Sequence, residues 1–506
     1  MEKPSAKIEA MPQQLVTDDE VAMAWEHALT TRRALKIYSK AVWYGAFVSL
    51  ALVMEGFDTK ILGSLYAVPA FQEVYGVRQP DGSYEISAPW QSGLGSIMGV
   101  TSIYGMFLGG WATERFGFRK TMMAALLSMP PIVFIFFFAP SLAVLAVAIC
   151  LFSFPLGIFQ TVTTVYVTDI MPVALRPYLT SFYSLAWALG QLLNAVIFRG
   201  TLTLPAPWTY RVPFALQWFW PILIIVDEAE AAVSRLTSGL DIDTQKLVSL
   251  MVFTTEHERQ VESGTSYFAC LRGTNLRRTI VVMGVYAMQL LTGSQFRGFM
   301  TYFFLQAGLP TDQSFNMTIV ALTLSVLGVL GAWVVMTYVG RRTMYLWDGA
   351  LTITLFTAIG GMGVKLHTSS SSPMAWAIGS LIAVDGFVAN LLILPVTFVL
   401  VSEIPSSFLR SKSVVIARNF YSAINILAGV MTPYMLNPTA WNWGAITEFF
   451  WAGAAVIGFI FTFFMVPESK GRTTAEMDIL FEKQVHVRKF KDTKVSLTHI
   501  EGGRLP

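Results

Sequence analysis

Two carboxylic acids lie inside an otherwise apolar stretch near the start of the chain. Glu55 and Asp58 stand about one helical turn apart within residues 41–62. An ionised carboxylate at the centre of a bilayer costs at least about 2.5–3.5 kcal/mol, so such a group normally faces a cavity or a partner. Burial also favours the neutral form of a carboxyl group. We predict a proton-binding site at Asp58, with Glu55 as its partner or as the titrating group itself. The alternative is a structural carboxylate that is hydrogen-bonded to a neighbouring helix.

Amide side chains inside other apolar segments form a second set of polar groups, namely Gln191, Asn194, Gln289, Gln295 and Asn425. An amide offers hydrogen-bond donors and acceptors without a net charge, which suits a hydroxyl-rich ligand such as a sugar. We predict that Gln191, Gln289, Gln295 and Asn425 bind the substrate. Hydrogen bonding between helices is the alternative for each amide.

Aromatic residues supply the matching apolar contact, because a ring can stack on the apolar face of a sugar. The candidates are Trp187, Trp218, Trp220 and Phe296. Ordinary packing or anchoring at the membrane surface is the commoner role of such residues.

Acidic and basic residues recur together at one end of the apolar segments. Asp169 is followed seven positions later by Arg176, and Glu403 is followed seven positions later by Arg410. Opposite charges at helix ends can form ion pairs that close one side of a cavity and break when it opens. Retention of basic residues on the cytoplasmic side is the alternative. The predicted gate comprises Glu114, Arg115, Arg119, Asp169, Arg176, Arg341, Glu403 and Arg410.

Motifs for catalysis and for cofactors are absent from the sequence. We find no metal-ligand cluster, phosphate-binding glycine loop, nucleophile elbow or catalytic triad. The net charge of +3 is small, and no basic stripe is interleaved with aromatic residues, which argues against nucleic acid as a partner. Cys150 and Cys270 are too few for a disulfide framework. We therefore expect that the protein is not an enzyme and that it binds neither a metal nor a cofactor.

The composition explains where these residues must lie. The chain of 506 residues is 54% hydrophobic and only 13% charged, whereas soluble domains carry about 25% charged residues. About 20 apolar residues are needed to cross a bilayer as a helix. Reading for such runs predicts an all-α membrane protein with twelve transmembrane helices at residues 41–62, 91–112, 120–139, 141–167, 178–198, 212–226, 279–299, 315–338, 345–364, 374–401, 413–436 and 446–466.

The charges between these segments predict the orientation and the domains. Most Lys and Arg residues lie in alternate loops and in both tails, which places the termini in the cytoplasm. Arg78, Arg199, Arg211, Arg297 and Lys365 fall on the other side. A Gly-then-basic turn recurs at Gly117 and Gly340, which indicates two duplicated six-helix halves. We divide the chain into a tail (1–40), a first half (41–226), a cytoplasmic linker (227–276), a second half (277–466) and a tail (467–506).

Several short motifs resemble those of the sugar porter branch of the major facilitator superfamily, and most of all those of fungal α-glucoside (maltose-type) permeases. The most specific is Pro-Glu-Ser-Lys-Gly-Arg-Thr at residues 467–473. The others lie at residues 55–59, 110–120, 172–176, 190–192, 301–309, 403–405, 417–419 and 432–441. The resemblance covers about residues 40–482.

This resemblance implies roles for particular residues. Asp58 matches the acid of the first helix in proton-coupled members. Gln191, Gln289 and Asn425 match positions that contact sugar hydroxyls, and Gln295 matches a polar position of the seventh helix. The charged loop residues match the inner gate of the family.

The sequence also departs from the family pattern. Glu114 stands where many members have Asp, and Leu290 stands where many have a second Gln. The fourth predicted helix lacks the Arg that pairs with the first-helix acid in bacterial proton symporters. The sixth, residues 212–226, spans only about 22 Å at 1.5 Å per residue, which is short of a bilayer core of about 30 Å.

We therefore expect a monomeric, multi-pass protein of the plasma membrane that imports a hexose or an α-glucoside, with a proton, through alternating access. A facilitative sugar carrier, an exporter of a small metabolite and a sugar sensor of the same fold are the alternatives. The expected partners are the sugar, the proton and the lipid bilayer.

Overall fold

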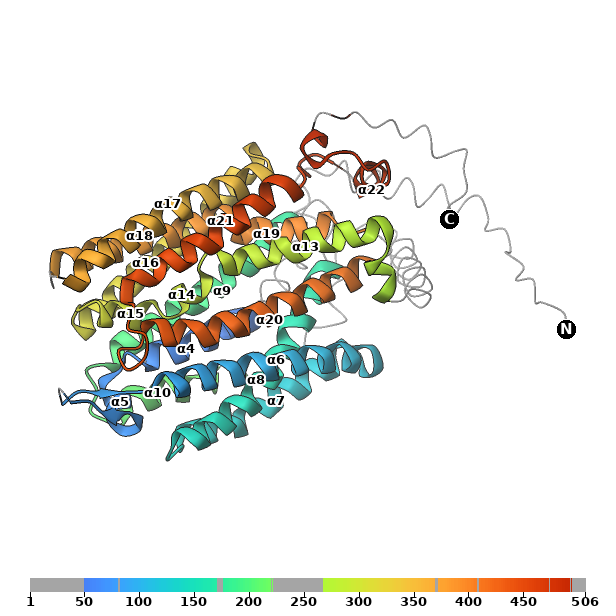
Figure 1. Ribbon diagram of the computed structural model, residues 1–506. Helices are drawn as coiled ribbons and strands as arrows, with labels where there is room; N and C mark the ends of the chain where they lie inside the picture. The colour runs from blue at the N-terminus through green and yellow to red at the C-terminus, as the bar shows by residue number, and fades with distance from the viewer. Residues whose placement is uncertain are drawn as a thin grey trace.

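The computed structural model describes residues 50–80, 82–170, 176–219, 221, 267–368, 372–406, 409–472, 474–491 and 493. This part of the chain is built almost entirely of helices that run side by side along one long axis (Figure 1). The only sheet found in it is the two-stranded hairpin of β1 (Val77–Arg78) and β2 (Tyr84–Glu85). The all-α fold is confirmed.

The helices of the first half form one bundle. They are α4 (Leu50–Leu65), the short α5 (Pro69–Tyr75), α6 (Ala88–Phe116), α7 (Phe118–Phe137), α8 (Leu142–Ile170), α9 (Arg176–Thr201) and α10 (Trp208–Leu216). The predicted segments at 91–112, 120–139, 141–167 and 178–198 each coincide with one of these helices to within a few residues. Residues 41–49, at the start of the first predicted segment, lie outside the described part.

The second half begins after a short helix, η1 (Tyr267–Leu271). Its helices are α13 (Gly273–Leu291), α14 (Ser294–Gly298), α15 (Met300–Gln306), α16 (Thr311–Tyr338), α17 (Arg341–Thr368), α18 (Ser372–Leu392), α19 (Leu394–Glu403), α20 (Arg410–Leu436), η3 (Gly444–Ile446) and α21 (Thr447–Met465). Two small helices, α22 (Thr474–Glu482) and η4 (Val487–Lys489), follow at the end opposite to α5 (Figure 1). We call the end of the bundle that carries α22 the α22 end. The opposite end, where α5 packs on the β1–β2 hairpin, is the hairpin end.

Helix contacts repeat between the two halves. In the first half α6 packs on α8 and α4 packs on α9, and in the second half α16 packs on α18 and α13 packs on α20. The halves meet through equivalent pairs as well, because α20 packs on α6 and α9 packs on α16. A duplicated six-helix unit predicts this pairing.

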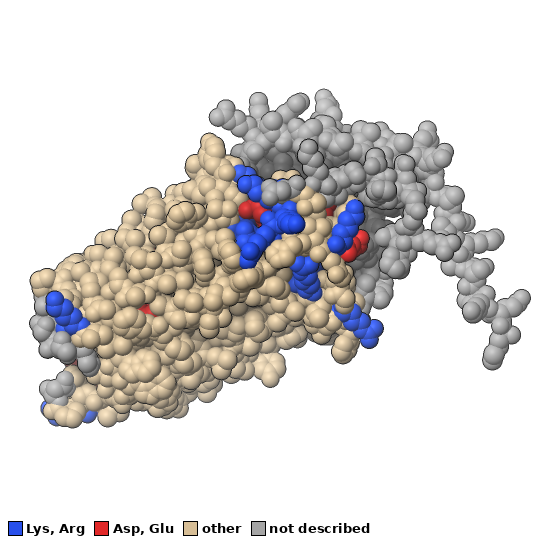
Figure 2. Space-filling view, turned by 45° about the horizontal axis from the view of Figure 1, so that its top comes forward, with Lys and Arg blue, Asp and Glu red and all other residues tan. Residues whose placement is uncertain are grey.

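The outer surface of the bundle is apolar, as a lipid environment requires. Large hydrophobic side chains such as Phe107, Val334 and Ile457 are more than half exposed. Figure 2 shows a broad band in which only a trace of acidic side chains reaches the surface, with Lys and Arg gathered mainly at the α22 end. Seven segments within the described residues are long and apolar enough to cross a membrane.

Two predicted segments are broken rather than continuous. The segment 279–299 divides into α13 and α14 at Gly293, whose φ of 77° is left-handed and therefore favours glycine. The segment 374–401 divides into α18 and α19 just before Pro395. The short segment 212–226 corresponds to α10, which ends at Leu216 in a turn; residues 222–226 lie outside the described part.

Glycines allow α4 and α9 to lie almost in contact. A Cβ at Gly190 would fall 2.0 Å from the carbonyl oxygen of Val53, and a Cβ at Gly56 would fall 2.2 Å from that of Trp187. Small residues let helix backbones approach closely in membranes, where packing drives association. The helix that carries Glu55 and Asp58 is thereby fixed against α9.

Replacing Gly190 by Ala should separate α4 from α9, because backbone atoms cannot give way as a flexible side chain does. We expect a loss of about 1–3 kcal/mol in stability, typical of overpacking. The midpoint of thermal unfolding of the detergent-solubilised protein measures it. Gly110→Ala is the matched control, because a Cβ there meets nothing within 4 Å. Equal midpoints for the two variants would contradict the close packing.

Candidate functional site

The acids of α4 lie where the two halves meet. Besides α9, α4 contacts α14 and α15 of the second half. Glu55 and Asp58 are each only 2% exposed. The two carboxyl groups are therefore enclosed by protein, and their role in binding a proton stays a prediction.

Glu55 is linked across the halves through one amide. Gln160 of α8 donates from Nε2 to Oε1 of Glu55 at 2.7 Å, and its Oε1 accepts from Nη2 of Arg418 at 3.3 Å. Arg418 comes from α20 and lies against the rings of Tyr286 and Tyr421, with its guanidinium carbon 5.8 and 4.9 Å from their respective centroids. The second half therefore supplies a cation beside the acid, which the sequence analysis sought only in the fourth helix.

Asp58 is held by α10. Gln217, directly after that helix, donates from Nε2 to Oδ1 of Asp58 at 2.8 Å. The second oxygen of Asp58 and the second oxygen of Glu55 have no hydrogen-bond partner among the described residues. Each acid thus has one fixed oxygen and one oxygen at which a proton can reside.

The predicted sugar-binding amides divide into two groups. Gln295 of α14 donates to Asn425 of α20, so these two are brought together. Gln191 is half-buried and Gln289 is 4% exposed, and neither side chain has a hydrogen-bond partner within the described ranges. Unpaired amides inside a bundle are available to a ligand.

The structure gives packing roles to three other candidates, Asn194, Trp218 and Phe296. Asn194 accepts from Ser64 at 2.7 Å and donates to the Phe57 carbonyl at 3.0 Å, which ties α9 to α4. Trp218 donates to the Pro130 carbonyl at 2.9 Å, and Phe296 is buried in the core. The suggestion that Trp218 or Phe296 stacks on a sugar is therefore not supported, because each is occupied by packing; Trp220 lies outside the described residues.

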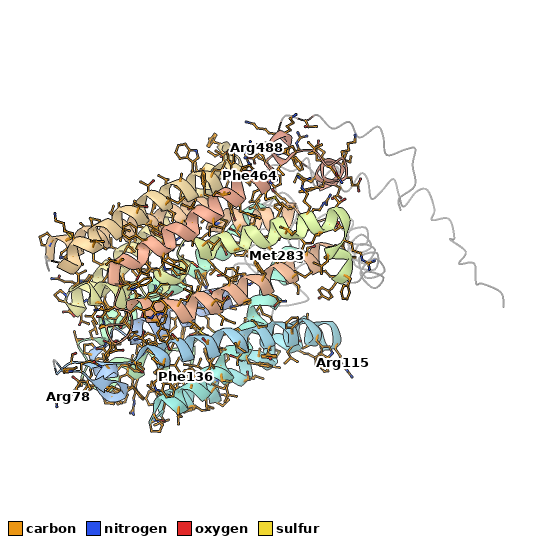
Figure 3. All side chains as sticks on the ribbon, in the orientation of Figure 1. Arg78, Arg115, Phe136, Met283, Phe464 and Arg488 are labelled. Carbon is orange, nitrogen blue, oxygen red and sulfur yellow. The ribbon has the colours of Figure 1, made fainter. Side chains whose placement is uncertain are left out.

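Two residues of the predicted gate pair with each other, whereas the spacing in the sequence paired Glu403 with Arg410, whose side chain the structure does not describe. Arg341, at the start of α17, lies 3.6 Å from Glu403, at the end of α19, and Ser469 donates to the same carboxylate. Arg115 is exposed and lies over the rings of Trp111 and Phe116. Arg115 and Arg78 mark opposite ends of the bundle (Figure 3). The side chains of Glu114, Arg119, Asp169, Arg176 and Arg410 lie outside the described part of the structure.

A larger set of buried charges lies in the second half. Arg297 of α14 donates from Nη1 to Oδ2 of Asp385 of α18 at 2.7 Å, and Thr352 of α17 lies 3.3 Å from the other oxygen. Asp348 and Glu448 are fully buried nearby, and none of their carboxylate oxygens has a hydrogen-bond partner in the described chain. Lys60 of α4 donates to the Arg297 carbonyl.

The sequence contained the signal for this set. Lys60, Asp348, Asp385 and Glu448 all fall inside predicted helices, where an ionisable residue marks a functional or paired position. The assignment of Arg297 to a loop on the outer side was wrong. The break after α13 places it inside the bundle, where Asp385 compensates its charge.

Comparison with known proteins identifies the family to which the chain belongs. Residues 45–481 match the family described as "Sugar (and other) transporter". The match covers far more than half of the chain, so the protein belongs to this family. It is accordingly a membrane transporter and not an enzyme, as the sequence predicted.

Two yeast proteins are among its relatives. The maltose permease MAL31 of Saccharomyces cerevisiae is 36% identical over 496 residues, which cover 93% of this chain and 80% of that protein. The general alpha-glucoside permease of the same species is 34% identical over 505 residues, covering 95% and 81%. The predicted resemblance to maltose-type permeases is confirmed.

Solved structures show the same fold. The inward-open conformation of the xylose transporter XylE from E. coli superposes with a TM-score of 0.67 at 18% identity, covering 88% of this chain and 99% of that one. A crystal structure of a D-xylose–proton symporter gives a TM-score of 0.65 at 18% identity, covering 86% and 100%. The chain therefore has the major facilitator fold.

Replacing Asp385 by Asn should leave the Arg297 guanidinium without its buried counter-charge. Breaking one side of a buried pair costs about 3–5 kcal/mol, so we expect a much lower unfolding midpoint. Pairing it with Arg297→Gln should recover part of the loss. Asp312→Asn is the control, because the Asp312 side chain is 65% exposed and its 3.6 Å pair with Arg199 contributes about 0–1 kcal/mol. An Asp385→Asn protein as stable as this control would contradict the role of the pair.

Proposed function

We propose that the protein imports a sugar, a hexose or an α-glucoside, across the plasma membrane together with a proton. The observation that carries the proposal is the pair of buried acids on α4, each with one oxygen held by an amide and one without a partner. Membership of a sugar transporter family and the relation to maltose and alpha-glucoside permeases support the choice of substrate class.

The sugar would bind between the halves, at amides that have unused hydrogen-bonding capacity. Gln191 of α9 belongs to the first half and Gln289 of α13 belongs to the second half, so a sugar held by both would join the two halves. Gln295 donates to Asn425, and a sugar hydroxyl can insert between them by donating to one and accepting from the other.

The proton would be taken up by the pair of acids, Asp58 and Glu55, and would act through the contact between Glu55 and Arg418. An ionised Glu55 attracts the Arg418 guanidinium, which the second half carries, through Gln160. Protonation of Glu55 removes that attraction and so changes the relative stability of the states in which the halves are joined or parted here. This differential interaction is what proton-coupled alternating access requires. Arg418 supplies the cation that the fourth predicted helix lacks. A cation near the acid favours symport over facilitated diffusion.

The membrane arrangement follows from the same proposal. Twelve segments would cross the membrane in two halves (41–226 and 277–466) with the linker (227–276) and both tails in the cytoplasm. The concentration of Lys and Arg at the α22 end supports this orientation (Figure 2). The hairpin end then faces the outside, and the Arg341–Glu403 pair belongs to the cytoplasmic gate. We propose that a monomer performs the cycle.

The decisive experiment is uptake of labelled maltose and of labelled glucose by a transporter-deficient yeast, with and without a proton uncoupler. We expect accumulation above the external concentration that the uncoupler abolishes. Uptake that equilibrates and is insensitive to the uncoupler would identify a facilitative carrier. Absence of uptake of either sugar would remove the proposed substrate class.

Replacing Asp58 by Asn should abolish accumulation driven by the proton gradient while sparing some sugar exchange. The amide keeps the size of the side chain but cannot take up a proton. Accumulation and exchange are measured in the same cells, and Asp312→Asn, a change of an exposed acid, should leave both unaffected. Normal accumulation by the Asp58→Asn protein would exclude Asp58 as the coupling group.

Replacing Gln191 by Ala should weaken uptake far more than it lowers the amount of protein in the membrane. Loss of one neutral hydrogen bond to a sugar costs about 0.5–1.5 kcal/mol, which raises the apparent KM by about 2- to 13-fold. Asn194→Ala provides the contrast, because it removes two hydrogen bonds between helices and should lower the amount of protein itself. Parallel loss of uptake and protein in the Gln191→Ala variant would make Gln191 structural.

A further inference from the structure

One buried acid lies far from the site on α4, at the hairpin end. Glu85 belongs to β2, in the connection between α4 and α6, and is 7% exposed. It contacts the second half directly: Tyr302 donates to Oε1 at 2.7 Å, and Gln306 donates to Oε2 at 3.3 Å, both from α15. Gln91 of α6 lies 3.5 Å from Oε1. The carboxyl group therefore joins the first half to the second half.

Other contacts show that this end of the bundle is closed. Asn437 donates to the Ile86 carbonyl at 2.8 Å, next to Glu85 in the chain. Ser92 donates to the Val430 carbonyl at 2.9 Å. The rings of Tyr66 and Phe299 are stacked with centroids 6.1 Å apart. Each of these contacts joins the first half to the second, so Glu85 is buried only while the halves are together here.

No cation compensates Glu85 within the described residues. The ion pairs found there do not include it, and the ionisable groups that face it are the phenols of Tyr302 and, behind it, Tyr66. Glu73 of α5 and Arg78 of β1 are exposed on the neighbouring elements. Burial raises the pKa of Glu85 to about 7, although the hydrogen bonds from Tyr302 and Gln306 act in the opposite direction.

We propose that Glu85 is a second proton-binding site, which takes up a proton from the outer solution when the hairpin end closes and returns it when that end opens. The inference rests on the proposed alternating access. Opening would separate Glu85 from Tyr302 and Gln306 and expose it to water. This proton never crosses the membrane, so the site sets how often the outer entrance is open and adds nothing to the transport stoichiometry.

The sign of the pH effect follows from the two states. The open state has the ordinary Glu pKa of 4.5, and the closed state has a pKa of about 7. The proton therefore favours the closed state fully below about pH 4.5, and this advantage is lost as the pH rises through about 7. Between pH 7 and pH 5 the ratio of closed to open molecules should rise by about 40-fold.

Distance measurements between spin labels test the proposal without any transport. Labels are attached at Val74→Cys on α5 and at Trp441→Cys after α20, two exposed positions on opposite halves, in a protein whose Cys150 and Cys270 are replaced by Ala. The protein is placed in lipid nanodiscs at pH 7 and pH 5. We expect the short-distance population to gain about 40-fold over the long-distance one at the lower pH.

Three further variants separate the site from general effects of pH. Glu85→Gln is neutral at both pH values and should abolish the pH response, whereas Glu73→Gln changes an exposed acid of the same region and should preserve it. Tyr302→Phe removes one donor to the ionised carboxylate. It should therefore lower the closed population at pH 7 and change the closed population at pH 5 only slightly.

An equal pH response in the Glu85→Gln and wild-type proteins would overturn the proposal, and so would an unchanged distance distribution in the wild type. Neither result depends on sugar or on a proton gradient. Failure of the uptake experiment would therefore count against symport, and failure of the distance experiment would count against the Glu85 site alone.

Discussion

Charges buried where the two halves meet impose the main constraint on this protein. A carboxylate or guanidinium removed from water needs a partner, a proton or a hydrated cavity, since water-free hydrocarbon offers none of these. Arg297 is compensated by Asp385, and Lys60 by the Arg297 carbonyl. Glu55 shares Gln160 with Arg418. Two of these contacts, Lys60 with Arg297 and Gln160 with Arg418, join opposite halves, so buried charge ties the halves to each other.

The two ends of the bundle differ in how they are joined. At the hairpin end the contacts are hydrogen bonds and ring stacking between the halves, such as Glu85 with Tyr302 and Tyr66 with Phe299. At the α22 end the described charge pairs, Arg341 with Glu403 and Arg278 with Asp478, lie within the second half and its extension. The structure is thus closed between the halves at the hairpin end, and it superposes on an inward-open sugar transporter.

Much of the fold was predictable, because long apolar segments identify helices with little ambiguity. The breaks were not: Gly293 divides a segment whose hydropathy is continuous, and only the tertiary structure reveals it. Glu55 and Asp58 were found because an acid in a short apolar motif is conspicuous. Lys60 and Asp348 carry the same signal, because each is an ionisable residue inside an apolar segment. Neither belongs to one of the short motifs that resemble the family, so neither stood out. The partners, such as Arg418 for Glu55 and Tyr302 for Glu85, lie more than 200 residues away and cannot be read from local sequence.

The interruption between α14 and α15 has a consequence for assembly. A helix end leaves carbonyl groups without intrahelical partners, and in the hydrocarbon core such groups need another donor. Here the Arg297 carbonyl receives its donor from Lys60, a residue of the other half. The first half therefore adds a donor at the bend of the second half, beside the N–H of Phe299 that follows α14. The bent form of this segment is in this respect shared between the halves, because one of its carbonyl groups is bonded from both.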